Sequence, residues 1–266
     1  MTPFSLLRRF RRVAAFVGVS RSPLQWLPLA LLGWARDNPS STVGRWLPTI
    51  RVRPAQLRGQ AVTVSATDLG QLMSFEEVFV ESVYDLGRVP FTPAVVFDCG
   101  GHVGFFSVLA RSTYPRVPLI VFEPNPENLG PLRRNLSTGS QVAIHAAAVS
   151  TRNGTCRFSA TASNAGRTGE SDVAGIEVAM LDFAAFVSGD PGAALLIKID
   201  IEGEEGRLVP HLLPVLPRQC ALFVETHHGM ASREALVDQL ASYGFEVSWL
   251  RVREPYADLF AVRGLA

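Results

Sequence analysis

The chain has 266 residues, of which 47% are hydrophobic and 18% charged, and its formal net charge is +1. This composition is typical of a globular protein with a sizeable core and excludes a disordered chain. The near-neutral charge gives no reason to expect a nucleic-acid partner. The three cysteines are far apart and have no zinc-binding spacing, so we expect reduced thiols and a cytoplasmic location.

Residues 1–90 are predicted to form an N-terminal extension of helices and short strands, and residues 91–266 a single domain. Arg8 to Arg12 precede one apolar run, and a second run at Pro23–Trp34 is broken by Pro28. Both runs are too short to span a bilayer, so we predict no transmembrane segment. The sequence favours a helix packed on the domain or on a partner, and the arginines permit peripheral contact with an anionic membrane surface.

The extension contains three further predicted elements. Two short strands, Ile50–Arg53 and Ala61–Ala66, flank a turn at Gly59. The sequence Ser-Phe-Glu-Glu predicts a capped helix from Ser74 to about Leu86.

After residue 90, apolar β-type runs alternate regularly with helical patterns. The predicted core strands are Ala94–Asp98, Leu119–Glu123, Val142–Val149, Ala194–Asp200 and Ala221–Thr226, with a final hairpin at Glu246–Leu250 and Leu259–Val262. The predicted intervening helices are Val103–Ser112, Glu127–Leu136, Gly206–Leu216 and Ser232–Tyr243. An insertion after the third strand predicts two added strands, Thr155–Ala160 and Gly175–Met180. The pattern predicts a doubly wound α/β fold with a mostly parallel, seven-stranded sheet.

A glycine-rich turn, Asp98-Cys99-Gly100-Gly101-His102-Val103-Gly104, follows the first of these strands. Glycine permits a tight turn and the close approach of a ligand to the backbone. A dinucleotide fingerprint that starts at Gly100 needs glycine at positions 102 and 105, where this chain has His102 and Phe105. The turn alone is equally compatible with a purely structural role.

The second strand ends in Glu123-Pro124, a little over twenty residues after the glycine turn. An acidic residue at this position can accept hydrogen bonds from both hydroxyls of a ribose. Ligands of such sheets bind outside the carboxyl ends of the strands. The turn and Glu123 together therefore predict a nucleoside-binding site.

Several motifs resemble those of the FkbM-type methyltransferases. They are DCGGHVGFFS at 98–107, FEPNP at 122–126, LD at 181–182, KIDIEGEE at 198–205 and VETH at 224–227. The pattern K-x-D-x-E-G-x-E is the most specific, and the resemblance covers about 95–227. It implies a Rossmann-like class I enzyme that uses S-adenosylmethionine to methylate hydroxyl oxygens of sugars, glycans or glycosylated natural products.

The resemblance also implies which residues bind the cofactor. The implied residues are Asp98, Gly100, Gly101, His102 and Gly104 at the methionine part, Glu123 with Pro124 at the ribose, and Asp200. His102 stands where the family more often has asparagine; both side chains can donate a hydrogen bond.

The reaction imposes its own demands on the site. Methyl transfer from a sulfonium is an in-line displacement whose leaving group departs neutral, so it needs no acid. A hydroxyl is a poor nucleophile and needs a general base or a metal. In the usual methyltransferase strand order, the fourth and fifth strands are neighbours, so the residues at their carboxyl ends share one region.

We predict that Asp200 and His227 activate the acceptor hydroxyl. Glu202 is predicted to orient His227 or to contact the cofactor or substrate, and Lys198 to hold the carboxylates in place. A lone lysine on an apolar strand, such as Lys198, is more often a structural ion-pair partner than a catalytic base. Asp200, Glu225 and His227 also have the donor types of a divalent-cation site, although their spacing does not require a metal.

Two other functions remain open: a nicotinamide-dependent (NAD) oxidoreductase on the same fold, and a non-catalytic cofactor-binding scaffold. The acceptor is not specified by the recognised motifs. Residues 1–90 are candidates for substrate or dimer contacts, so a homo-oligomer is also open. The polar loop at 160–174 is predicted to close over the acceptor.

Overall fold

The computed structural model describes residues 3–38, 47–137, 141–159, 167–169, 175–190, 192–227, 230–254 and 256–264. The chain forms two compact units whose segments alternate along the sequence. The first comprises Met1–Tyr84, Val103–Thr113 and Pro131–Thr138; the second comprises Asp85–His102, Tyr114–Gly130 and Gly139–Ala266. The two-domain division at residue 90 stays a prediction.

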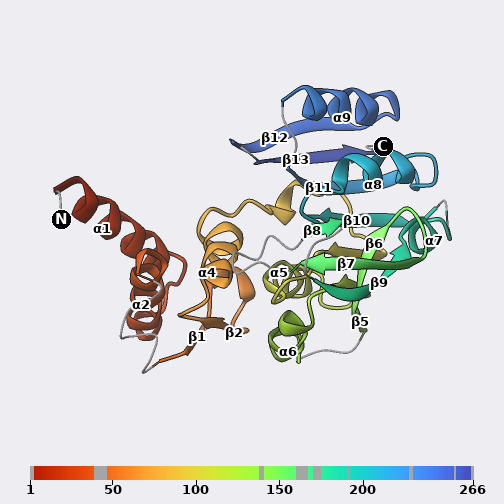
Figure 1. Cartoon of the computed structure of the whole chain (residues 1–266). Helices are drawn as coiled ribbons and strands as arrows, with labels where there is room; N and C mark the ends of the chain where they lie inside the picture. The colour runs from red at the N-terminus through yellow and green to blue at the C-terminus, as the bar shows by residue number, and fades with distance from the viewer. Residues whose placement is uncertain are drawn as a thin grey trace. The chain divides into compact units, whose positions relative to one another are not determined.

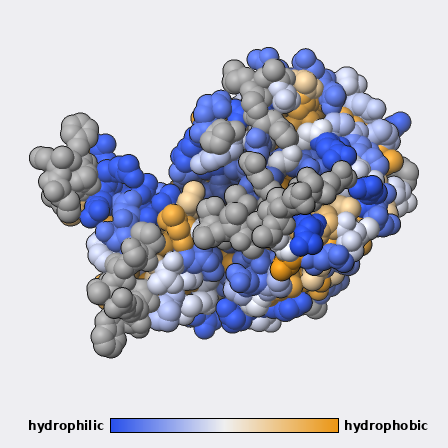
Figure 2. Space-filling model, viewed as in Figure 1, coloured by the Kyte–Doolittle hydropathy of each residue, from blue (hydrophilic) through white to orange (hydrophobic). Residues whose placement is uncertain are grey.

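The first unit begins with a helical hairpin, α1 (Pro3–Gly18) and α2 (Trp26–Asp37), joined through the 3-10 turn η1 (Pro23–Gln25). Gly33 allows the two helices to approach closely, because a Cβ atom there would lie 3.0 Å from the Cα of Val13. On the face seen in Figure 2, strongly hydrophilic side chains line α1.

The rest of the first unit includes the two predicted short strands, β1 (Thr49–Val52) and β2 (Val62–Ser65), which pair antiparallel. The helix predicted from Ser74 begins earlier, as α4 (Leu69–Phe75), and continues as a π-helical turn, η3 (Glu76–Val80). The prediction of its start was wrong because Asp68 is the cap: its carboxylate accepts a hydrogen bond from the N–H of Gln71 at 3.1 Å.

The second unit is built on a seven-stranded sheet in the order β12-β13-β11-β10-β3-β4-β5. Figure 1 labels β12, β13, β11, β10 and β5 of this sheet. Its strands are β3 (Val95–Cys99), β4 (Leu119–Phe122), β5 (Val142–His145), β10 (Ala194–Ile199), β11 (Gln219–Thr226), β12 (Glu246–Arg253) and β13 (Tyr256–Arg263). The central strands pair in parallel, and β13 is antiparallel to both of its neighbours. The predicted α/β class, the mostly parallel sheet and the final hairpin are confirmed.

The insertion forms a second sheet of four strands in the order β6-β9-β7-β8. These strands are β6 (Ala147–Ser150), β7 (Gly154–Ser159), β8 (Arg167–Gly169) and β9 (Ile176–Asp182). The predicted third strand, Val142–Val149, was wrong as one element, because its second half leaves the core sheet and pairs with β9. The insertion contributes one strand more than predicted. Of the loop predicted to close over the acceptor, only 167–169 belong to the described residues.

The other helices of the described residues are η2 (Ala55–Leu57), η4 (Leu86–Arg88), α5 (Phe105–Thr113), α6 (Pro126–Asn135), α7 (Ala184–Val187), α8 (Glu205–Leu212) and α9 (Met230–Ser242). Apolar side chains of α8 and α9 pack with those of β10 and β11 in the core of the second unit. Every residue of β10 is buried, and one of them is Lys198. A buried ammonium group is costly unless it is paired, so Lys198 requires partners.

All three cysteines are free thiols. None of the described helices combines the length and the apolar composition that a membrane crossing requires.

Candidate functional site

The glycine turn after β3 is fixed by close packing of its backbone. Gly100 has φ +83°, and a Cβ atom there would collide with the carbonyl oxygen of Asp200. A Cβ at Gly101 would collide with the side chain of Val121. Only glycine fits these two positions, because the turn runs directly against the strand ends beside it. Gly104 also has a positive φ and belongs to the first unit.

Glu123 holds this turn in place from the end of β4. Its buried carboxylate accepts hydrogen bonds from the backbone N–H groups of His102 (2.6 Å) and Asn125 (2.8 Å) and from the side-chain amide of Asn128 (3.2 Å). His102 is in the left-handed region (φ +47°), which turns its N–H toward Glu123. Burial raises the pKa of Glu123, while these hydrogen bonds oppose the rise.

Lys198 connects the ends of β3 and β10. Its Nζ lies 3.3 Å from Asp98 and 3.3 Å from Asp200, and it donates to the carbonyl oxygen of Gly100 at 2.5 Å. Burial opposes the charge on Lys198, but the carboxylates of Asp200 and Asp98 hold its pKa above the ordinary value. A lysine that stays protonated in this way is an ion-pair partner and a poor general base.

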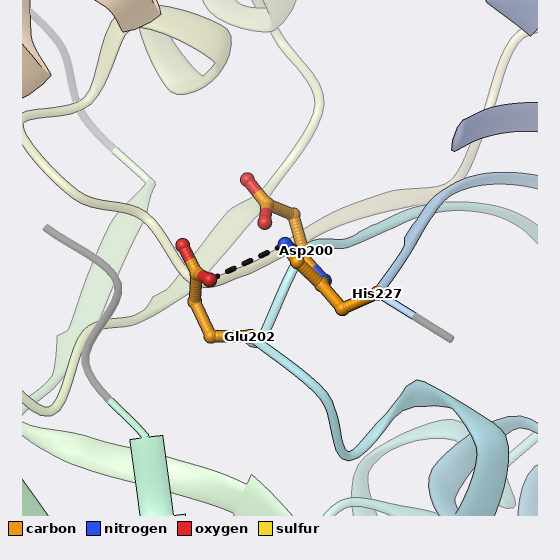
Figure 3. A group of neighbouring side chains, drawn as sticks. All are labelled: Asp200, Glu202 and His227. Carbon is orange, nitrogen blue, oxygen red and sulfur yellow. Dashed lines mark ion pairs between the residues drawn. The ribbon is translucent and has the colours of Figure 1, made fainter. Parts of the chain in front are cut away.

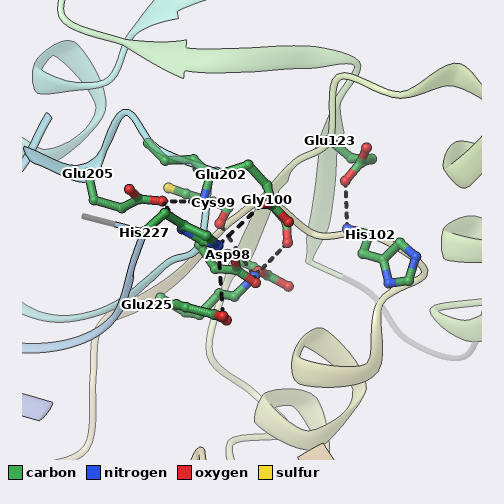
Figure 4. Close-up of polar contacts among 12 residues, drawn as sticks. Asp98, Cys99, Gly100, His102, Glu123, Glu202, Glu205, Glu225 and His227 are labelled. Atoms are coloured by element: carbon green, nitrogen blue, oxygen red, sulfur yellow. Dashed lines mark hydrogen bonds and ion pairs between the residues drawn. The ribbon is translucent and has the colours of Figure 1, made fainter. Parts of the chain in front are cut away.

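His227, which directly follows β11, is fixed through both ring nitrogens. Its Nδ1 lies 3.0 Å from Glu205, whose carboxylate is fully buried, and its Nε2 lies 3.2 Å from Glu202 and 3.8 Å from Glu225 (Figures 3 and 4). Glu205 is itself held by the N–H groups of Ile201 (3.2 Å) and Gly203 (3.0 Å). The imidazole therefore presents Nε2 to the carboxylates at the end of β10.

The backbone after β10 makes this arrangement possible. Glu202 has φ +61° and Gly203 has φ +117°, so the chain turns sharply before α8 begins at Glu205. A non-glycine residue in the left-handed region is strained, and such strain is often found at functional sites.

The electrostatics of His227 and Glu202 follow from these contacts. Burial lowers the pKa of His227, but Glu205, Asp200 and Glu202 outweigh it and raise the pKa to about 9. Burial and the neighbouring Asp200 raise the pKa of Glu202 to about 7, against the opposing charge of His227. At neutral pH the surrounding carboxylates therefore favour the protonated form of His227.

The same groups have the donor types of a cation site. Asp200, Glu202 and His227 each offer one atom, and the three atoms lie within 4.8 Å of one another. The sequence predicted Asp200, Glu225 and His227 as metal ligands. In the structure the group within this distance contains Glu202 in place of Glu225. Carboxylate oxygens and an imidazole nitrogen are ligands that divalent ions accept.

The structure thus brings together Lys198, Asp200, Glu202, Glu225 and His227, as the sequence predicted for the ends of the fourth and fifth strands. Asp98 joins them through its ion pair with Lys198, which the sequence analysis did not predict. Glu205 was missed as a functional candidate. The available signal was its place as the last glutamate of K-x-D-x-E-G-x-E. Its role depends on a partner from the next strand, which local sequence does not reveal.

Comparison with known protein families decides the class of the chain. Residues 98–247, more than half of the chain, match the model of the methyltransferase FkbM domain. The chain belongs to the FkbM methyltransferase family. The matched region includes the glycine turn, Glu123 and the residues around His227.

Individual relatives match over shorter stretches. The methyltransferase sdnD of Sordaria araneosa is 35% identical over 63 residues, which are 24% of either chain. Methyltransferase 1 of Beauveria bassiana is 28% identical over 71 residues, which are 27% of this chain and 28% of the relative. The match thus spans about a quarter of the length of each of these two methyltransferases.

A solved structure shares the fold. TYW2 of M. jannaschii, in complex with AdoMet, superimposes with a TM-score of 0.50 over 81% of this chain and 85% of the other, at 10% identity. At this identity, the likeness concerns the fold alone.

Proposed function

We propose that this FkbM-family protein transfers a methyl group from S-adenosylmethionine to a hydroxyl oxygen of a sugar, a glycan or a glycosylated natural product. The observation that carries the proposal is the Glu205–His227 pair at the end of β11. A sugar hydroxyl loses its proton only far above neutral pH, so the reaction needs a base. An imidazole whose Nδ1 is fixed by a buried carboxylate is a suitable one.

The proposed cofactor site lies at the glycine turn and Glu123. When bound, S-adenosylmethionine would supply a methyl group attached to a sulfonium sulfur. After methyl transfer, the rest of the cofactor is a neutral thioether. Asp98, Gly100, Gly101 and His102 would bind its methionine part, with Gly104 following in the chain. Glu123 would bind the ribose with Pro124 beside it.

The hydrogen bonds that Glu123 already accepts within the protein limit how many it can accept from a ribose. A carboxylate has about four lone-pair positions. Two hydrogen bonds reach Oε1 and one reaches Oε2. One position on Oε2 is left, which supports a hydrogen bond from one ribose hydroxyl where the sequence predicted two.

The charge of the site also suits this cofactor. Two cationic side chains, Lys198 and His227, face five carboxylates. These carboxylates are Asp98, Asp200, Glu202, Glu205 and Glu225. The excess of negative charge favours a ligand that carries a sulfonium and an ammonium group.

In the proposed step, neutral His227 accepts the proton of the acceptor hydroxyl at Nε2. Glu205 stabilises the imidazolium through Nδ1, and Glu202 and Asp200 border the position that the proton enters. Lys198 acts as a positioning residue, because it holds Asp200 and Asp98 and remains protonated.

The pH dependence of methyl transfer tests this assignment. His227 can accept a proton only when it is neutral, and its pKa is raised to about 9. We therefore expect kcat/KM to rise as the pH increases from 7 and to level off above about 9. Glu205→Gln removes the charge that raises this pKa, so the rising limb should move to lower pH. A merely structural role of Glu205 would leave the midpoint unchanged, and that result would contradict the proposal.

The same profile, measured after chelation and again with added magnesium, separates the two ways of activating the hydroxyl. We favour proton transfer to Nε2 of His227 over activation of the hydroxyl by a metal ion. Lys198 already forms an ion pair with Asp200, and Nε2 lies only 3.2 Å from Glu202. Activity that survives chelation supports this choice. Loss of activity that magnesium restores would instead assign Asp200, Glu202 and His227 to a cation.

A further inference from the structure

The N-terminal helices differ in charge from the rest of the protein. Residues 1–37, which end with α2, contain six arginines and one acidic residue, Asp37, whereas the whole chain has a formal net charge of +1. The remaining residues therefore carry a net negative charge. Such charge segregation is typical of a segment that contacts an anionic partner.

The same segment exposes an unusual amount of apolar surface. Of the twelve large hydrophobic side chains that are exposed in the described part of the chain, five lie between residues 7 and 27. They are Leu7, Phe10, Leu24, Trp26 and Leu27. Phe10 is 77% exposed and Leu24 is 86% exposed, and exposed apolar side chains that gather in one segment are typical of an interaction surface.

The exposed residues of α1 lie on one face of the helix. Leu7, Phe10 and Ala14 are three or four residues apart and exposed, whereas Phe16 is fully buried against the first unit. This outer face is therefore not needed to pack α1 within the first unit. We call this face of α1, together with the exposed side chains of Leu24 in η1 and of Trp26 and Leu27 at the start of α2, the N-terminal surface.

Basic side chains accompany the N-terminal surface. Arg8 and Arg11 are exposed on α1, and Arg21 is exposed in the turn that follows. By contrast, Arg12 and Arg36 are partly buried and paired with Glu76. Arg8 also lies 3.9 Å from Asp37, but its side chain stays 75% exposed, so Arg8, Arg11 and Arg21 remain accessible beside exposed apolar side chains.

We propose that the N-terminal surface binds the face of an anionic lipid membrane. Arginines attract acidic headgroups, while aromatic and leucine side chains enter the boundary between headgroups and acyl chains. A second copy of the chain is a poorer partner, because a twofold contact would bring the arginines of both copies together. The helices are too short and too polar to cross the bilayer, so the contact is peripheral.

The test is co-sedimentation of the full-length protein with phosphatidylcholine vesicles that contain or lack phosphatidylserine. We expect binding that requires phosphatidylserine and weakens with salt. Each arginine near an anionic surface adds about a factor of five in affinity, so R8E/R11E should bind at least about thirtyfold more weakly. The control R133E/R134E reverses two exposed charges on α6 and should bind like the wild type.

The apolar part of the contact has its own control pair. Leu24→Asp should weaken vesicle binding, whereas Val215→Asp, at another exposed hydrophobic position, should not. Equal binding by R8E/R11E and the wild type, or no dependence on phosphatidylserine, would overturn the proposal. A lipid-free dimer that Leu24→Asp dissociates would also overturn it, because the surface would then join two copies. Titration of every variant with S-adenosylhomocysteine shows separately whether the cofactor site is intact.

Discussion

Replacing His227 by glutamine is expected to lower kcat for methyl transfer by a factor of about 10² to 10⁴, the usual contribution of a general base. Glutamine keeps a polar side chain of similar length but cannot accept a proton from the acceptor. The measurement is transfer of labelled methyl from S-adenosylmethionine to a hydroxylated acceptor found by screening with the wild type. Binding of S-adenosylhomocysteine should change little, because His227 is assigned to the acceptor side.

His211→Gln is the matched control. His211 also contacts a carboxylate, that of Asp182 at 3.2 Å, but it lies outside the cluster at the strand ends. Its replacement should leave kcat within about twofold, since its half-buried pair with Asp182 lies outside the proposed acceptor site. An unchanged kcat for His227→Gln would remove His227 from the reaction.

Replacing Lys198 by methionine is expected to cost about 3–5 kcal/mol of folding free energy, because removing one partner leaves a buried charge uncompensated. The side chain of Asp98 is fully buried and lies 3.3 Å from the ammonium group. Methionine fills a similar volume, so the loss should come from charge and not from a cavity. Urea unfolding of both proteins measures the difference.

Two further variants separate charge from packing. Adding Asp98→Asn to Lys198→Met should recover part of the lost stability, because it removes the uncompensated carboxylate. Arg207→Met breaks an exposed pair with Glu204 and should cost no more than about 0.5 kcal/mol. A loss below about 1 kcal/mol for Lys198→Met would show that Asp98 does not depend on this lysine.

The sequence pattern predicted the sheet well at strands that are buried on both faces, because burial requires apolar residues there. The run Ala194–Ile199 is buried at every position, so its apolar residues identify a central strand and make Lys198 conspicuous. Pattern failed at Val142–Val149, which is one apolar run divided between two sheets. The division depends on pairing between β6 and β9, which local sequence does not specify.

The candidate site divides in the same way. Asp200 and His227 could be predicted because parallel strands place their carboxyl ends at one edge of a sheet. The role of Glu205 could not, since it depends on a contact between the start of α8 and the residue after β11. Likewise, both Asp68 and Ser74 are suitable helix caps. The N–H of Ser65 donates to the side-chain oxygen of Gln71, and the Gln71 amide donates to the Asp68 carboxylate at 3.0 Å, which helps to select Asp68.

The central claim is that the glycine turn and Glu123 bind S-adenosylmethionine. Its most direct test is calorimetric titration with S-adenosylhomocysteine and, separately, with NAD. The variants are Glu123→Gln, and Glu127→Gln as an exposed control in the first turn of α6. We predict saturable binding of S-adenosylhomocysteine by the wild type and by Glu127→Gln, at least tenfold weaker binding by Glu123→Gln, and no binding of NAD. Binding of NAD, or no binding of S-adenosylhomocysteine, would contradict the account.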